Sequence, residues 1–380
     1  MAKFDESFKK FMASEGGNGI TDLGKNADEV VLCSNCFQDQ GLRLDAFAIG
    51  IKGNQKCPNC NSESGHLLTR ELVWTLCDRF FVRGSFVNFE YGGSPLIQFN
   101  EQHFNHSDIE VSPWLEKDVK LIERVGKIGL FYYGPNAWMY GEIGPLKSLQ
   151  NATERNQVIN EILQTYPVIE LSDKNFFYRL RRNPHISHDI FEFDTAPDNR
   201  QGKNRFDSVG FPVLYCSADL ELCIHECRAT VADNLFVGKL VPIHLLKVLD
   251  LTAVLNEGVT PSESLDLAMH FVFLAGERSY EICRQIALKA KENGFDGIIF
   301  PSFYSHIRTG TKPIETLYGL PIRQIPQLKN YASSQSIPNL ALFGRPIREK
   351  RVKVECINKV IINKVIYQTS FGPAYLKSNF

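Results

Sequence analysis

Two pairs of cysteines near the N-terminus have the spacing of a metal site. Each pair forms a CxxC turn, and the four residues are Cys33, Cys36, Cys57 and Cys60. Such a turn holds two thiolates close together, and zinc takes four soft ligands at the corners of a tetrahedron. Because four cysteines leave no coordination position for a substrate, the pattern predicts a structural Zn²⁺ site.

Disulfides and redox catalysis are the alternatives for these cysteines. The first residues, MAKFDESFKKFMASEGG, carry charges and no apolar stretch, so we expect no secretory signal. In a cytoplasmic protein, two tight cysteine pairs favour a metal over disulfides. One metal ion also explains both pairs more simply than two redox motifs do.

The second feature that could take part in a reaction is a glutamate on a helix expected at 219–233. The inward face of this helix is marked by Leu222, Cys223, Ala229 and Thr230. Glu226 and Cys227 fill the intervening positions, where the periodicity predicts apolar residues. A carboxylate there must either pair with a cation or line a cavity. The pattern alone does not choose between these two readings.

A serine follows a short apolar strand expected at 297–300. The preceding helix has its apolar stripe at Ile282, Ile286 and Ala290. Ser302 lies just past the C-terminal end of the strand, where ligand-contacting side chains gather in α/β proteins. A lone serine in such a place is more often a turn former.

Helices and strands fall in different parts of the chain. The expected helices before residue 166 cover 67–84, 114–128 and 151–165, the last with Asn151 as N-cap. Later, strands are expected at 176–182, which contains Arg179, and at 211–217. The tail from 352 to 367 has alternating charge and predicts a solvated β-hairpin.

The composition fits a two-domain globular protein. The chain has 380 residues, of which 43% are hydrophobic and 22% charged, and its net charge is −1. This balance requires neither a nucleic acid nor an acidic membrane as partner. No run of 18 apolar residues predicts a membrane span, and the patterns of zinc proteases, P-loops and dinucleotide-binding loops are absent.

The order and spacing of these segments, over about 175–335, resemble the RES domain, a family named for its arginine, glutamate and serine. The resemblance rests on four segments, FFYRLRR with Arg179, RFDSVGFPVLYCS with Arg205 and Tyr215, ELCIHECRA with Glu226, and IALKAKENGFDGIIFPS ending at Ser302. The zinc-bearing front part resembles an N-terminal extension of larger RES proteins. We therefore expect a zinc-binding, mostly helical module at 1–165 and a RES domain at 166–380 with a basic β tail.

The resemblance implies an α/β (α+β) fold similar to ADP-ribosyltransferases. It also implies an enzyme that degrades NAD⁺ in a bacterial cytoplasm, as a toxin or defence effector with a possible cognate antitoxin. The acceptor of the cleaved group, whether water, phosphate or a protein side chain, and the oligomeric state stay open. The other functions considered are a protein ADP-ribosyltransferase and a non-catalytic zinc-finger module that binds nucleic acid or a partner protein.

The resemblance also suggests roles for individual residues. Glu226 would stabilise the oxocarbenium-like transition state of nicotinamide–ribose cleavage. Arg179 first, and Arg205 second, would bind the pyrophosphate. Tyr215 would contact nicotinamide or ribose, and Ser302 the ribose or the carboxamide. Tyr178 and Arg308 complete the expected substrate-binding set.

The segment after Ser302 departs from the family pattern. Family members continue with a basic residue and then a glycine–asparagine stretch that leads into an apolar strand. Here the run is SFYSHIRTGTKPIETLYG. Arg308 and Gly310 fill part of that pattern, but an asparagine is missing.

Overall fold

The chain divides into two compact units. The computed structural model describes residues 29–89, 92–103, 106–132, 143–197, 199, 201–309, 315–317, 320–366 and 369–375. The first unit comprises the described parts of Met1–Phe86, Pro95–Gly134 and Gln368–Phe380, and the second those of Val87–Ser94 and Pro135–Tyr367. No helix among the described residues is both long and apolar enough to cross a bilayer.

The described part of the first unit combines three α-helices with short strand pairs. Its elements are β1 (Val30–Cys33), α2 (Gln40–Ile49), β2 (Leu67–Thr69), α3 (Arg70–Cys77), β5 (Ile97–Asn100), α4 (Glu116–Gly126) and β6 (Gly129–Tyr132). β1 pairs with β2, and β5 with β6, both antiparallel. The helix predicted at 67–84 begins only at Arg70, because Thr69 accepts a hydrogen bond from the Leu72 amide as N-cap. A π-helical turn, Asp78–Val82, continues it.

A segment near the C-terminus packs into the first unit. The Phe371 amide donates a hydrogen bond of 3.0 Å to the Asp45 carboxylate, which is buried. The backbone of Gly372 approaches Gly84 so closely that a Cβ on Gly84 would lie 2.5 Å from the Gly372 Cα. Residues 369–375 are therefore part of this unit, although most of the preceding 230 residues belong to the other.

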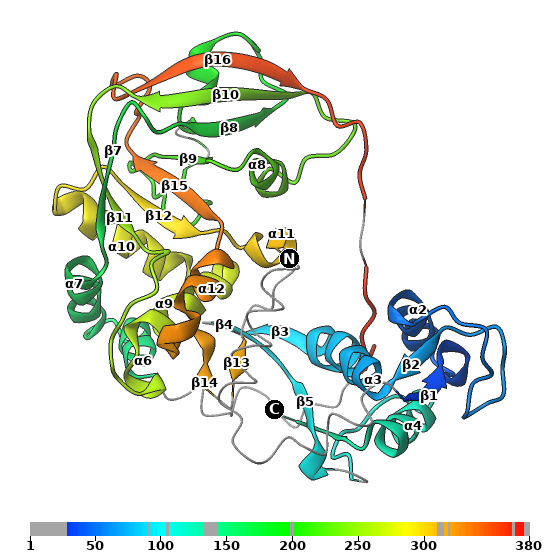
Figure 1. Ribbon diagram of the computed structural model, residues 1–380. Helices are drawn as coiled ribbons and strands as arrows, with labels where there is room; N and C mark the ends of the chain where they lie inside the picture. Colours follow the sequence, from blue (N-terminus) through cyan, green and yellow to red (C-terminus); the bar gives the residue numbers. More distant parts are fainter. Residues whose placement is uncertain are drawn as a thin grey trace. The chain divides into compact units, whose positions relative to one another are not determined.

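The second unit is built on an eight-stranded mixed sheet of order β16-β10-β8-β9-β15-β12-β11-β7. Figure 1 shows β16, β10 and β8 side by side at one end of it. Its strands are β7 (Val168–Leu171), β8 (Phe177–Arg182), β9 (Val213–Ser217), β10 (Leu235–Pro242), β11 (Leu246–Asp250), β12 (Gly297–Pro301), β15 (Pro338–Phe343) and β16 (Val352–Val360). Only β11 and β12 pair in parallel; the other neighbours are antiparallel.

Helices supply the second layer of this unit. They are α6 (Gly144–Gln150), α7 (Arg155–Thr165), α8 (Leu220–Glu226), α9 (Leu265–Leu274), α10 (Tyr280–Glu292), α11 (Ser305–Thr309) and α12 (Lys329–Ser334). Two further short strand pairs are β3 (Phe86–Phe89) with β4 (Gly92–Pro95), and β13 (Thr316–Leu317) with β14 (Leu320–Pro321). The fold is thus of the mixed α+β class.

Two apolar clusters cover the two faces of the sheet. The larger one joins α6, α7, α9 and α10 to the sheet through residues such as Ile159, Phe271, Ile286 and Ile298. The predicted stripe of Ile282, Ile286 and Ala290 is fully buried in it. The second cluster includes Phe193, Leu240 and Leu342. Burial of these side chains is the main favourable contribution to folding.

Three local predictions were wrong. The helix at 219–233 ends at Glu226, because Arg228 takes a left-handed conformation (φ 48°). Asn151 does not cap α7: its side chain accepts from the Thr153 amide, and the helix starts at Arg155. The tail forms no hairpin among the described residues. Instead β16 pairs with the distant β10 along its whole length.

Candidate functional site

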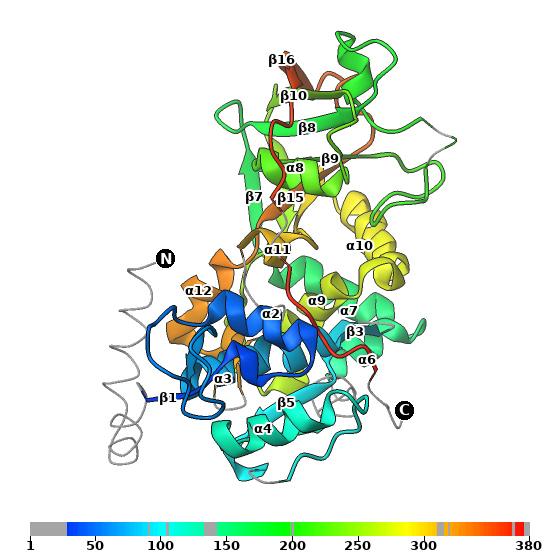
Figure 2. The same cartoon turned by 90° about the vertical axis from the view of Figure 1, so that its right-hand side faces the viewer.

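A cavity of about 790 Å³ opens in the second unit beside α8. In both views α8 lies next to β8 and β9 (Figure 1, Figure 2). Five residues predicted for the site line this cavity: Tyr178, Arg179, Arg205, Tyr215 and Glu226. Its volume is in the range of small-molecule sites. Six basic side chains line it against two acidic ones, so it favours an anionic ligand.

Glu226 is the last residue of α8, and its side chain is exposed to the cavity. One carboxylate oxygen, Oε1, accepts a hydrogen bond of 2.5 Å from the Ser302 hydroxyl and one of 2.6 Å from the Asn339 amide group. Neither a hydrogen bond to Oε2 nor an ion pair of Glu226 is found among the described residues. Of the two readings open from the sequence, the carboxylate therefore lines a cavity, with one oxygen fixed and the other available.

Ser302 lies behind Glu226 and does not line the cavity itself. It is 5% exposed, and its backbone amide donates to the Ile337 carbonyl at 3.0 Å. Its hydroxyl also accepts from the Tyr304 amide at 3.1 Å. The serine is thus held by the backbone on both sides, and its hydroxyl hydrogen is directed at Glu226. This geometry suits a residue that positions the carboxylate.

Arg179 and Arg181 of β8 share one hydrogen-bond acceptor. Arg179 donates to the Tyr215 carbonyl at 2.5 Å and to the Asp194 carbonyl at 2.8 Å. Arg181 donates to the same Asp194 carbonyl at 2.6 Å and to the Glu192 carbonyl. Neither arginine has an ion pair within the described part of the chain. Burial lowers the pKa of both, and for Arg181 the neighbouring Arg179 charge lowers it further.

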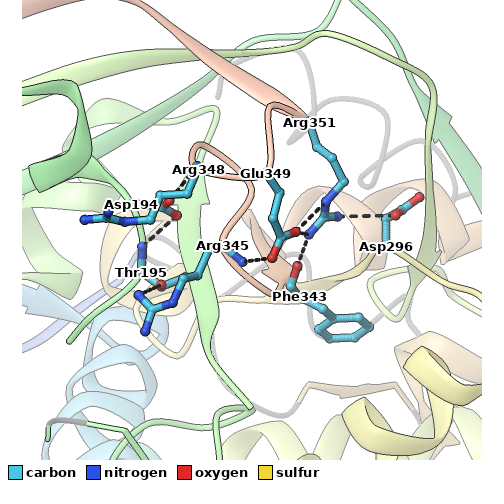
Figure 3. A network of polar contacts seen from close by, with 8 residues as sticks. All are labelled: Asp194, Thr195, Asp296, Phe343, Arg345, Arg348, Glu349 and Arg351. Atoms are coloured by element: carbon cyan, nitrogen blue, oxygen red, sulfur yellow. Dashed lines mark hydrogen bonds and ion pairs between the residues drawn. The ribbon is translucent and has the colours of Figure 1, made fainter. Parts of the chain in front are cut away.

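The shared carbonyl belongs to a residue that is fixed by a polar network (Figure 3). The buried Asp194 carboxylate accepts from the Thr195 amide and from the Arg348 amide, both at 2.9 Å. Arg345, from the same segment after β15, donates to the Thr195 hydroxyl at 3.1 Å. The loop that follows β15 therefore holds in place the acceptor that aligns the two guanidinium groups.

Arg205 contacts aromatic rings more than polar groups. Its guanidinium carbon lies 5.3 Å from the centroid of Phe273 and 5.2 Å from that of Tyr280. These are cation–π distances. Its hydrogen bonds are long, 3.4 Å to the Phe273 carbonyl and 4.0 Å to the Cys283 sulfur. The side chain is 6% exposed, and it presents a charge on the cavity wall.

Both tyrosines predicted for the site line the cavity, but the Tyr215 hydroxyl also has a structural role. It accepts from the Phe206 amide at 2.9 Å and lies 3.5 Å from the Asp207 carboxylate. Burial raises the pKa of Tyr215 well above its ordinary value, so the group stays neutral. Tyr178 packs edge-on against Phe176.

Arg308 is a predicted site residue that neither lines the cavity nor contacts Glu226 in the described structure. Its guanidinium lies 2.6 Å from the Glu221 carboxylate and 3.9 Å from that of Asp219. Both partners belong to the start of α8, at the end of the helix opposite Glu226. The arginine thus joins α11 to α8 and does not face the ligand space.

Two residues in the site were missed by the sequence analysis. Asn339 is the second residue of the apolar strand β15, and its side-chain amide donates to the Glu226 carboxylate. The segment PNLALF that carries it is separated from Ser302 by α11 and α12. Arg181 lies in the strand expected at 176–182 but was given no role; it is two residues from Arg179, and β-strand alternation places both on the same face.

The four cysteines of the first unit meet as predicted. Their sulfur atoms all lie within 4.8 Å of one another. Cys33 is 3.9 Å from Cys36 and 3.6 Å from Cys60, and Cys36 is 3.5 Å from Cys57. With zinc–sulfur bonds of about 2.3 Å, a regular tetrahedron has edges of about 3.8 Å. The donor set therefore fits a four-coordinate ion such as Zn²⁺.

The surroundings of the cluster support metal binding. Asn59 donates to the Cys36 sulfur at 3.2 Å, and Arg124 holds the Asn59 side chain at 2.8 Å. Burial raises the pKa of the Cys33 and Cys36 thiols, and binding of a metal ion would displace their protons. His66 stacks on Phe47, with a centroid distance of 3.8 Å, and is not part of the cluster.

The comparisons with known proteins identify the class of domain. Residues 176–311 match the family model of the RES domain, so the chain contains a RES domain as its sequence predicts. No curated protein matches the chain. Among solved structures, a chain of the M. tuberculosis MbcT-MbcA toxin-antitoxin complex is similar, with 13% identity and a TM-score of 0.32. This similarity covers 53% of the present chain and 91% of that one.

Proposed function

We propose that this protein is an enzyme that cleaves the bond between nicotinamide and ribose in NAD⁺. The observation that carries the proposal is the Glu226 carboxylate, fixed by Ser302 and Asn339 in a cavity whose other charges are mostly positive. A carboxylate suits the developing cation on the ribose, and the arginines suit the diphosphate. The RES domain at 176–311 supports the same chemistry.

Cleavage breaks the bond between ribose C1′ and the pyridinium nitrogen. The bonding electrons go to that nitrogen, so nicotinamide leaves as a neutral molecule and the ribose acquires oxocarbenium character. The free Oε2 of Glu226 stabilises this charge or accepts a hydrogen bond from the ribose 2′-hydroxyl. Water then adds to C1′ and loses a proton, giving ADP-ribose; phosphate would give the phosphorylated sugar instead.

The remaining residues bind and orient the substrate. Arg179, and then Arg205, contribute positive charge for the diphosphate, while Tyr178 and Tyr215 offer rings to a base or a ribose. Ser302 acts on the substrate through Glu226, whereas Asn339 holds Glu226 and also lines the cavity. The Zn²⁺ site lies in the other unit and has no open coordination position, so its role is structural.

The direct test is release of free nicotinamide from NAD⁺ by the purified full-length protein, with and without phosphate. Glu226→Gln keeps the shape of the side chain and its acceptor oxygen but removes the charge. We expect nicotinamide release to fall roughly 100-fold or more in this variant, with an unchanged thermal midpoint. Phosphate dependence would identify the acceptor, and label from NAD⁺ retained on protein would identify a transferase.

Equal release by the wild-type protein and Glu226→Gln would refute the assignment of Glu226. No release under any condition would refute the proposed activity for this protein as isolated.

A protein that destroys NAD⁺ has to be restrained in its own cell. We therefore propose a toxin or defence role in a bacterial cytoplasm, with an antitoxin or other regulatory partner. The test is expression of the wild-type chain and of Glu226→Gln in a bacterial host. Growth arrest and a fall in cellular NAD⁺ in cells that express the wild-type chain, but not in cells that express Glu226→Gln, would support the role. Equal growth of the two cultures would contradict it.

A further inference from the structure

The main cavity is bordered by a second, smaller hollow of about 370 Å³. The residues common to both linings are Arg179, Arg181, Lys203, Asn204 and Tyr215. Glu226 lines only the first space, whereas Ala196 and Gln201 line only the second. The ligand space therefore has two compartments, with a cluster of positive charges at their junction.

At this junction the two arginines of β8 are held close together. Both donate to the Asp194 carbonyl, so their guanidinium groups lie within hydrogen-bonding distance of the same atom. Two like charges repel strongly in a partly desolvated place. Among the described residues no carboxylate forms an ion pair with either of them. The arrangement is favourable once an anion binds between them.

A buried hydrogen-bond donor of Arg179 without a partner also indicates an anion site. Arg179 is 7% exposed, and its Nε has no hydrogen-bond partner in the described structure. An unsatisfied buried donor is costly, and a bound ion is one of the partners that can satisfy it. Guanidinium groups present planar forks of donors that match phosphate oxygens. Two such groups and Lys203 are therefore suited to a diphosphate.

We propose that Arg179 and Arg181 bind the diphosphate in the middle of the dinucleotide, and that the smaller hollow receives the nucleoside that is not cleaved. This inference rests on the proposed function and extends it, since it assigns both a new residue and a direction to the ligand. The nicotinamide riboside half lies towards Glu226. The other half lies towards Gln201, with apolar contact from Ala196 and Val213 and polar contact from Asn204.

The rigidity of the hollow supports this assignment. The Asp207 carboxylate accepts from the Gly202 and Asn204 amides, both at 2.8 Å. Arg284 donates to the Gly202 carbonyl at 2.8 Å. These bonds fix the loop that carries Lys203 and Asn204. A preformed pocket loses little entropy on binding a nucleoside.

Equilibrium binding of ADP tests the inference without any bond cleavage. ADP contains the diphosphate and the uncleaved nucleoside but no nicotinamide. For the full-length protein we expect ADP affinity to fall about tenfold to 100-fold in Arg181→Gln. Arg182→Gln is the matched control on the same strand: its guanidinium is half exposed, lies 3.8 Å from Asp233 and does not line either space. We expect this control to stay within twofold of wild type.

A second variant tests the hollow separately. Ala196→Trp places a large ring in it, and we expect at least tenfold weaker ADP binding with pyrophosphate affinity within threefold of wild type. Unchanged ADP affinity in a folded Arg181→Gln protein, or in Ala196→Trp, would overturn the inference. Arg181 donates to two carbonyls, so thermal midpoints are measured in parallel.

A measurement on the wild-type protein covers the case in which Arg181→Gln does not fold. Inorganic pyrophosphate must then displace ADP competitively, and failure to compete would overturn the inference. The outcome is also distinguishable from failure of the proposed function. If the protein cleaves NAD⁺ but Arg181→Gln leaves ADP binding unchanged, only this inference is refuted. If Arg181→Gln weakens ADP binding but the wild-type protein does not cleave NAD⁺, only the proposed activity is refuted.

Discussion

The hydroxyl of Ser302 donates a hydrogen bond of 2.5 Å to the carboxylate of Glu226, 76 residues earlier in the chain. The serine follows β12, and the glutamate ends α8. Asn339, at the start of β15, donates to the same oxygen at 2.6 Å. Two donors on one oxygen fix the rotation of the carboxylate and leave the other oxygen towards the cavity. For the proposed reaction, we infer that these two residues position Glu226.

The first prediction concerns the two donors. In Ser302→Ala and in Asn339→Ala, Glu226 keeps its charge but loses one bond of its support. A hydrogen bond to a charged group contributes about 1.5–3 kcal/mol. We therefore expect kcat for nicotinamide release to fall roughly tenfold to 100-fold, with a smaller change in KM. Steady-state kinetics on NAD⁺ measures both.

A purely structural role would give a different result. In that case the thermal midpoint would fall and kcat would change in proportion to the folded fraction. Ser302→Thr retains the hydroxyl and is expected to recover part of the rate. Full activity in both alanine variants would refute the positioning role.

The second prediction concerns Asp194, whose carbonyl accepts hydrogen bonds from both Arg179 and Arg181. Figure 3 shows the network that fixes this aspartate. Its carboxylate uses both oxygens, one for the Thr195 amide and one for the Arg348 amide. Asp194→Asn keeps only one acceptor and brings an NH₂ group against a backbone donor. We expect KM for NAD⁺ to rise about tenfold with a smaller effect on kcat, because the arginines lose their alignment and Glu226 does not.

Asp296→Asn is the matched control for this prediction. Like Asp194, Asp296 binds the segment that follows β15: its carboxylate accepts a hydrogen bond of 3.3 Å from the Arg351 guanidinium. No hydrogen bond joins it to Asp194 among the described residues. We expect a modest loss of stability and an unchanged KM. An equal rise of KM in both variants would show that the effect of Asp194→Asn is a general loss of packing.

How much of this site could be predicted from the sequence depends on the range of the interactions. The four cysteines of the candidate metal site could be found because ligand spacing within two CxxC turns is a local property. Glu226 was found because it breaks a helical apolar pattern, although the helix proved shorter and the residue exposed. Asn339 could not be assigned from spacing, since its bond to Glu226 spans 113 residues.

The fold shows the same limit. Buried strands such as β9 and β12 were predicted, because continuous apolar runs are characteristic of strands covered on both faces. The pairing of β16 was not, because its alternating pattern is equally compatible with a hairpin and with an edge strand. Which partner it takes is decided by β10, more than 100 residues earlier. The same limit applies to the side chain of Arg308. Its partners at the start of α8 are far away in the sequence, so only tertiary packing brings them together.

The third prediction is that Arg308 contributes little to substrate binding. It pairs with Glu221 and Asp219 at the surface, and its side chain is 37% exposed. Exposed ion pairs contribute about 0.2–1 kcal/mol to stability. In Arg308→Gln we therefore expect KM for NAD⁺ to change by less than twofold and the thermal midpoint by a few degrees at most. A tenfold rise in KM would restore the substrate-binding role expected from the sequence.

The fourth prediction concerns the metal and a glycine beside it. A Cβ on Gly65 would lie 2.6 Å from the Cys33 sulfur and 2.9 Å from the Cys33 Cβ, which is too close for any side chain. Gly65→Ala must therefore displace one ligand of the cluster. We expect the purified wild-type protein to carry about one Zn²⁺ per chain, and the variant to lose it at least tenfold faster to a chromogenic chelator.

Gly53→Ala is the control, because its Cβ would meet only a terminal methyl of Leu67 at 3.0 Å, and that side chain can shift. Since metal binding to such sites is coupled to folding, chelation should unfold the first unit. We expect the chelated protein to lose the protection of residues 30–77 from hydrogen exchange. Residues 265–300 should stay protected, because they belong to the core of the other unit. Equal metal retention in Gly65→Ala and wild type would contradict the assigned geometry, and a metal content of zero in the wild-type protein would contradict the zinc site itself.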